Sequence, residues 1–183
     1  MRAIACEKSE NYDQAVDSAR RAVKLSPGSY AALYTLGRLY SSNPLRNAEA
    51  INTLNAALKI RPDAVEPKIL IVNLLSRMGE NAGARPYLLQ LQKVPAFAND
   101  PALLNRLGVI YALSNQTLRA QTMFVRAFKY AGNDPDTVFN TARFFTFYNP
   151  QRQFSRQLYS RFEKLAAGSE KYTAELDEAR SVK

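Results

Sequence analysis

The feature that most constrains this chain is a sequence pattern that returns about every 34 residues. The segment Leu36-Gly37-x-x-Tyr40 reappears as Leu107-Gly108-x-x-Tyr111, two such intervals further along the chain. The tripeptide Asn99-Asp100-Pro101 returns after one interval as Asn133-Asp134-Pro135. Alanines follow the same interval, at Ala15, Ala50, Ala84 and Ala120. A period of this length indicates a stack of similar supersecondary units, and it constrains the architecture more firmly than local propensities do.

Each period is predicted to contain two helices joined by a short turn. In the second period, the apolar face of the first helix is followed by the turn Ser41-Ser42-Asn43-Pro44 and by a second helix with its own apolar face. A glycine inside a helix costs roughly 1 kcal/mol relative to alanine, so Gly37 needs a packing reason. We expect Gly37 to let the two helices approach closely, with Ala50 on the partner helix and Tyr40 filling the space beyond.

At these positions the chain resembles the tetratricopeptide repeat (TPR) family, whose unit carries a bulky residue, Leu-Gly, Tyr, Ala, an apolar residue, Ala and Pro in that order. The second repeat matches it at Leu33, Leu36, Gly37, Tyr40, Ala50, Leu54, Ala57 and Pro62. The fourth repeat matches it at Leu104, Leu107, Gly108, Tyr111, Ala120, Phe124 and Ala127. The third and fifth repeats depart from it, with Ile71-Val72 and Thr141-Ala142 where Leu-Gly belongs.

The resemblance implies an all-α fold, a right-handed α-solenoid of about five TPR-like helical hairpins with a C-terminal capping helix. We predict one solenoid domain over residues 1–183. Its parts are a truncated first repeat (1–29), repeats at 30–64, 65–100 (degenerate), 101–134 and 135–168 (degenerate), and the capping helix (169–183). Met1 falls inside the first predicted helix, so we expect either an excerpt of a longer protein or a shortened first hairpin. Cys6 occupies the position of Tyr40 and Tyr111, and it is predicted to be a small core residue.

Composition excludes much enzyme chemistry. The chain has no histidine, and Cys6 is its only cysteine, so Ser-His-Asp and Cys-His catalysis, histidine metal sites and an internal disulfide are excluded. The sequence contains no glycine-rich nucleotide loop. We therefore expect no enzyme activity, no catalytic residues, no metal and no cofactor.

Binding is the function that the repeat pattern favours, because the first helices of stacked hairpins line a concave groove. Helical phase assigns its residues, which lie away from the Leu-Gly-Tyr face. Asparagines there can bond an extended peptide backbone, arginines can hold carboxylates, and aromatic rings can take apolar side chains. The predicted groove residues are Tyr34, Arg38, Asn73, Arg77, Asn105, Phe139 and Arg143.

A second contact surface is predicted from the aromatic residues near the end of the chain. One face of a helix cannot bury the whole of Phe144-Phe145-x-Phe147-Tyr148. Some of these rings must be exposed or covered by a partner, and exposed apolar patches mark interaction sites. Phe147 and Tyr148 are the first candidates for such a contact.

The chain carries a formal net charge of +9, so a protein or peptide partner of acidic character is expected. The alternative is a basic adaptor that binds nucleic acid or an anionic surface through the convex second helices, at Arg119, Arg126, Arg152 and Arg156. No apolar run approaches the ~20 residues of a membrane-spanning helix. A lone cysteine is compatible with both the cytoplasm and the periplasm. Residues 104–127 also resemble the repeats of TPR lipoproteins that assist pilus or envelope assembly.

Overall fold

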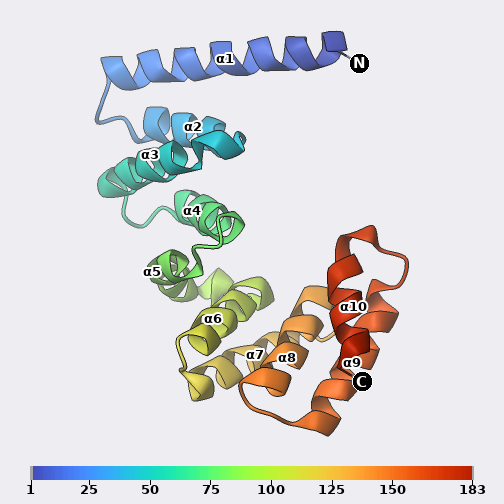
Figure 1. Ribbon diagram of the computed structural model, residues 1–183. Helices are drawn as coiled ribbons and strands as arrows, with labels where there is room; N and C mark the ends of the chain where they lie inside the picture. The colour runs from blue at the N-terminus through green and yellow to red at the C-terminus, as the bar shows by residue number, and fades with distance from the viewer. Residues whose placement is uncertain (1, 183) are drawn as a thin grey trace. The chain divides into compact units, whose positions relative to one another are not determined.

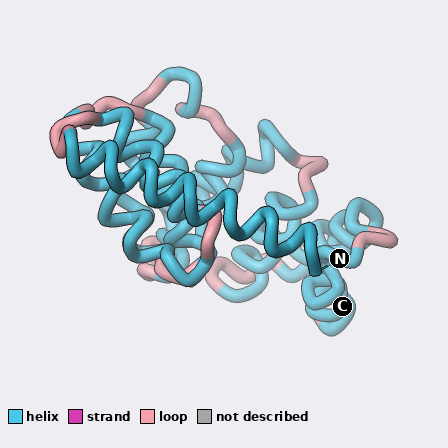
Figure 2. The backbone as a smooth tube through the Cα atoms, turned by 90° about the horizontal axis from the view of Figure 1, so that it is seen from above, coloured by secondary structure: helices cyan, strands magenta, loops and turns pink. Residues whose placement is uncertain are grey.

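The computed structural model describes the backbone of residues 2–182 and the side chains of residues 11–182. Over residues 2–182 it contains ten α-helices, three short 3-10 helices and no strand (Figure 2). The predicted all-α class is therefore confirmed. The prediction for the Cys6 side chain lies outside the described residues.

The chain divides into two compact units, Met1–Tyr87 and Leu88–Lys183. The boundary falls inside one helix, α5 (Asn81–Gln92). The single domain predicted over residues 1–183 and its repeat boundaries remain predictions. Each unit is described below by itself.

The first unit runs from blue to green in Figure 1. It contains α1 (Arg2–Leu25), α2 (Tyr30–Ser41), η1 (Pro44–Arg46), α3 (Asn47–Ile60), α4 (Val65–Arg77) and the start of α5. Residues 2–25 form a single helix, without the turn that the repeat pattern predicts between the two helices of the first repeat. Helix α1 packs on α2, where the Tyr12 hydroxyl donates a hydrogen bond to the Leu39 carbonyl oxygen at 3.2 Å.

Close packing of α2 against α3 explains Gly37. A Cβ atom at Gly37 would lie 2.7 Å from Cγ of Leu54, which is closer than two non-bonded carbon atoms can approach. The residue nearest to Gly37 is therefore Leu54, and Ala50 lies on the partner helix as expected. Ala50 itself is fully buried, one helical turn earlier on α3.

The second unit repeats this arrangement with new residues. After the end of α5 it contains η2 (Pro95–Phe97), α6 (Pro101–Leu113), α7 (Thr117–Ala131), α8 (Pro135–Phe147), α9 (Arg152–Ala166), η3 (Glu170–Tyr172) and α10 (Thr173–Ser181). Gly108 on α6 meets Phe124 on α7, where a Cβ atom at Gly108 would lie 2.9 Å from Cζ of the ring. The repeated Leu-Gly pair thus marks the same close helix contact in both units.

The repeated Asn-Asp-Pro tripeptide starts α6 and α8. Asp100 accepts a hydrogen bond from the Leu103 backbone N–H at 2.7 Å, and Asp134 accepts one from the Thr137 N–H at 2.8 Å. These carboxylates are N-caps, and the proline after each occupies the first turn, where no N–H is needed.

The asparagine of each tripeptide joins the loop to the second helix of the hairpin. Asn99 accepts a hydrogen bond from Arg126 of α7 at 2.8 Å. Asn133 accepts one from Arg161 of α9. One short motif therefore starts the first helix and fixes it to the second.

Helix α10 covers the apolar side of α9. Ala179 is fully buried, and the Tyr172 ring meets the Phe162 ring edge-on at 5.6 Å between centroids. Gly168, just before this segment, adopts a positive φ of 76°, which glycine tolerates and which ends α9. The C-terminal helix thus packs as a cap, as the sequence predicted.

Candidate functional site

The predicted groove residues of the first unit lie on two neighbouring first helices, α2 and α4. Tyr34 and Arg38 lie on α2, and Asn73 and Arg77 lie on α4. Arg77 donates a hydrogen bond to the Ser41 carbonyl oxygen at 2.8 Å, so its guanidinium ties α4 to the end of α2. The Tyr34 ring stacks in parallel on Tyr30 at 5.9 Å. The structure therefore brings these residues onto adjacent helices, and it gives Arg77 a structural contact.

The predicted groove residues of the second unit differ in accessibility. Phe139 is only 6% exposed, because its ring packs on Phe162 at 4.8 Å and on Tyr159 at 6.0 Å. Arg143 forms an ion pair with Glu178 of α10, with 3.0 Å between Nε and Oε1. Phe139 thus serves the core, and Arg143 holds the cap.

Asn105 is different, because it faces a cavity of about 490 Å³ that we call the α6–α8 pocket. This pocket is lined by Asp100, Pro101, Ala102, Asn105, Arg106, Ala131, Asp134, Asp136 and Asn140. Asn105 is 7% exposed, and its Oδ1 has no hydrogen-bond partner among the described residues. A buried acceptor left unpaired costs about 1–3 kcal/mol. A ligand that donates a hydrogen bond would recover that free energy.

The charges around the α6–α8 pocket favour a ligand that donates hydrogen bonds over a ligand that carries negative charge. Its lining contains three carboxylates and one guanidinium. Burial lowers the pKa of Arg106. Asp136 is paired with Lys171 at 3.0 Å, and hydrogen bonds to Tyr172 and Asp136 raise the pKa of that ammonium group. A peptide N–H or a side-chain amide therefore suits this pocket better than a carboxylate.

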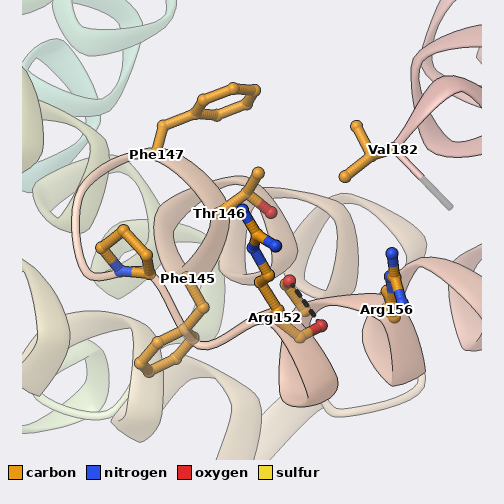
Figure 3. A pocket seen from close by; sticks show the side chains of 8 residues that line it. Phe145, Thr146, Phe147, Arg152, Arg156 and Val182 are labelled. Atoms are coloured by element: carbon orange, nitrogen blue, oxygen red, sulfur yellow. Dashed lines mark hydrogen bonds between the residues drawn. The ribbon is translucent and has the colours of Figure 1, made fainter.

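A second cavity, of about 410 Å³, lies where α8 ends and α9 begins (Figure 3). We call it the α8–α9 pocket, and its lining residues are Phe145, Thr146, Phe147, Pro150, Arg152, Ser155, Arg156 and Val182. Phe147, predicted as a contact residue, is 58% exposed and lines it. Tyr148 is also exposed but stacks on Phe144 at 6.3 Å and does not line the pocket.

Sequence reasoning missed several residues of these pockets. Asn140 lines the α6–α8 pocket from α8, one residue after the position that phase counting assigned to the groove. Pro150 and Val182 reach the α8–α9 pocket from a loop and from the end of α10. The segment around Pro150 has a helix-stop signal, but the sequence near Val182 contains no signal for such a contact.

The arginines of the basic-adaptor alternative fall into two groups. Arg119 donates to the Gln116 side chain at 2.7 Å, and Arg126 bonds both Asn99 and the Ala98 carbonyl oxygen. These two side chains are therefore held by intramolecular bonds. Arg152 and Arg156 line the α8–α9 pocket, and neither forms a salt bridge with the residues that the structure describes.

Paired helices with a Leu-Gly close contact and repeated N-caps define a helical-repeat fold of the TPR class. Comparison with solved structures confirms that fold. The chain is similar to YrrB, whose structure is described as a TPR protein with an unusual peptide-binding site, at a TM-score of 0.76 and 15% identity over 98% of this chain and 88% of that one.

Two further structures are similar. MamA from Desulfovibrio magneticus RS-1 superposes with a TM-score of 0.72 and 14% identity over 91% of this chain and 92% of that one. PilW, described as a widely conserved type IV pilus biogenesis factor, gives a TM-score of 0.66 and 18% identity over 98% of this chain and 85% of that one. No protein-family model and no curated protein matches the sequence. At these identities the likeness shows the fold.

The described residues also lack a membrane-spanning helix and a cluster of metal ligands. No helix in the described part of the chain has the length and hydropathy needed to cross a membrane. Among those same residues, no group of three or more Cys, Asp or Glu side chains is placed to hold a metal ion.

Proposed function

We propose that this protein is a non-catalytic scaffold that binds a peptide or protein segment on the first-helix surface of its repeats. The observation that carries the proposal is the buried, unpaired Oδ1 of Asn105 inside the α6–α8 pocket. That atom accepts a backbone N–H of the bound segment, and Asn140, which lines the same pocket, offers both a donor and an acceptor. The apolar Pro101, Ala102 and Ala131 give the segment a surface to cover.

In the first unit, the same function is assigned to Tyr34, Arg38 and Asn73. The Tyr34 ring, held by Tyr30, offers a flat apolar face. Arg38 is exposed in the last turn of α2 and is free to turn toward a carboxylate. The peptide-binding site described for YrrB and the pilus role described for PilW support a peptide ligand and a place in envelope or pilus assembly.

The test uses Asn105→Leu, which keeps the side-chain shape and removes the acceptor. Peptides are selected on the wild-type protein from a random displayed library, and their affinities are measured by calorimetry. We expect binding to weaken about five- to tenfold, while stability stays equal or rises because an unpaired buried group is gone. Asn52→Leu, an exposed change on α3, is the matched control.

Two outcomes would contradict the proposal. Selected peptides that bind Asn105→Leu as tightly as the wild type would remove the α6–α8 pocket from the site. A library that yields no binder to the wild-type protein would remove the peptide function itself.

A further inference from the structure

The α8–α9 pocket has a charge pattern that the α6–α8 pocket lacks. Its two charged lining residues are Arg152 and Arg156, and no carboxylate lines it. The two arginines stand four residues apart at the start of α9, so they share one side of that helix. Figure 3 shows both side chains rising from α9 toward the cavity, with Phe147 and Val182 on either side beyond them.

The acidic residues of the neighbouring cap do not neutralise these arginines. Glu178 is engaged by Arg143 at 3.0 Å, and Asp177 lies 3.4 Å from Arg180. Within the described residues, neither Arg152 nor Arg156 has an ion-pair partner. Two guanidinium groups beside one cavity therefore present five donors each with no internal anion to take them.

The rest of the pocket wall is mainly apolar. Phe147 exposes 58% of its surface, and Pro150 and Val182 continue the apolar wall. Together these side chains form an apolar surface bordered by two arginines, and apolar surfaces rimmed by polar residues are a feature of interaction sites. Aromatic residues, phenylalanine included, and arginine are also enriched at protein interfaces relative to the rest of the surface.

We propose that the α8–α9 pocket binds an acidic peptide segment of a partner protein, independently of the first-helix surface. A carboxylate of the segment lies between Arg152 and Arg156, where the guanidinium forks bond it. An apolar side chain next to that carboxylate packs on Phe147 and Val182. This pocket is thus the part of the protein that would recognise the acidic partner expected from the net charge.

The observations favour a peptide over a nucleic acid. Binding a strand of nucleic acid requires cations placed along several successive phosphates. The other second-helix arginines do not extend the pocket, because Arg126 bonds Asn99 and Arg161 bonds Asn133. A cavity of about 410 Å³ with two cations matches one carboxylate and one apolar side chain.

The experiment measures fluorescence anisotropy of a labelled peptide, Glu-Asp-Phe-Glu-Asp, on the full chain. The comparison probes are the same peptide with Gln and Asn in place of its acids, and single-stranded oligothymidylate of about ten nucleotides. The variants are Arg152→Gln/Arg156→Gln and Phe147→Ala, all exposed positions. Lys129→Gln/Lys164→Gln removes the same charge outside the pocket and is the matched control.

We expect the acidic peptide to bind the wild-type protein and the lysine control alike. The double arginine variant should weaken binding roughly ten- to hundredfold, and Phe147→Ala should weaken it about threefold or more. The proposal is overturned if the acidic peptide does not bind, if its neutral form binds equally well, or if the arginine variant leaves its affinity unchanged. Tighter binding of oligothymidylate, lost in the same variant, would overturn it in favour of nucleic acid.

Discussion

Gly37 places α2 against α3 because it has no side chain, and the space it leaves is filled by Leu54. We predict that Gly37→Ala lowers the free energy of unfolding by about 1–2 kcal/mol. The added methyl group meets Leu54 at 2.7 Å, and this overpacking outweighs the gain of roughly 1 kcal/mol in helix propensity. Urea unfolding followed by circular dichroism measures the change.

Gly83 supplies the control for that prediction. It also lies inside a helix, α5, but a Cβ there would stand 3.5 Å from Leu75, at ordinary contact distance. Gly83→Ala should therefore leave stability unchanged or raise it by about 0.5–1 kcal/mol. Equal effects at the two glycines would show that helix packing does not explain Gly37.

Individual residues also show which contacts could not be predicted from the sequence. The Leu-Gly-Tyr spacing predicted a close helix contact at Gly37, but it could not name Leu54, since the register between two helices depends on their packing. Helical phase placed Asn105 and Phe139 away from the Leu-Gly-Tyr face. It did not reveal that α9 covers Phe139 or that a cavity opens at Asn105, because coverage depends on neighbouring helices.

At the scale of the element, helix starts are set by single residues. Asp134 caps α8 by accepting a hydrogen bond from the Thr137 N–H, whereas Ala64 at the start of α4 makes no such bond. We predict that Asp134→Ala destabilises the protein by about 1 kcal/mol. The opposite change, Ala64→Asp, should stabilise it by a similar amount, because the new carboxylate supplies the missing cap.

Thermal unfolding compares these variants with Asp63→Ala, an exposed aspartate in the loop before α4. That control should leave the melting temperature almost unchanged, since Asp63 does not cap a helix. A loss for Asp63→Ala as large as that for Asp134→Ala would mean that loop charge, and not capping, determines stability here.

The helices differ in how well their bounds can be predicted from the sequence. The Asn-Asp-Pro tripeptides, which in the sequence indicated only the repeat, start α6 and α8, because the cap and the proline act locally. In contrast, α1 continues from Arg2 to Leu25 as one helix, where the repeat pattern predicted the end of a first helix, a turn and a second helix. The start of a helix can therefore be predicted from the sequence where a capping residue determines it. A helix end is harder to predict where the chain has no helix-stop residue.

At the scale of the whole molecule, the repeat period predicted the all-α TPR-type fold that the structure and its likeness to solved structures confirm. The α8–α9 pocket was beyond that prediction. Its wall combines the end of α8, a loop, the first turns of α9 and Val182 after α10. No periodic signal links these segments, so only their packing brings them together.

The net charge of +9 is also a property of the whole molecule, and it acts on the rate of encounter with an acidic partner. We predict that raising salt from about 50 to 200 mM slows association of the acidic peptide severalfold and changes its dissociation rate little, because long-range attraction is screened while desolvated contacts are not. Stopped-flow fluorescence separates the two rates, and the neutral peptide is the control.

A nucleic-acid strand held through many phosphates would instead lose on the order of a thousandfold in affinity over this range of salt concentration. A loss of that size for the peptide would mean that diffuse charge, and not the α8–α9 pocket, holds it.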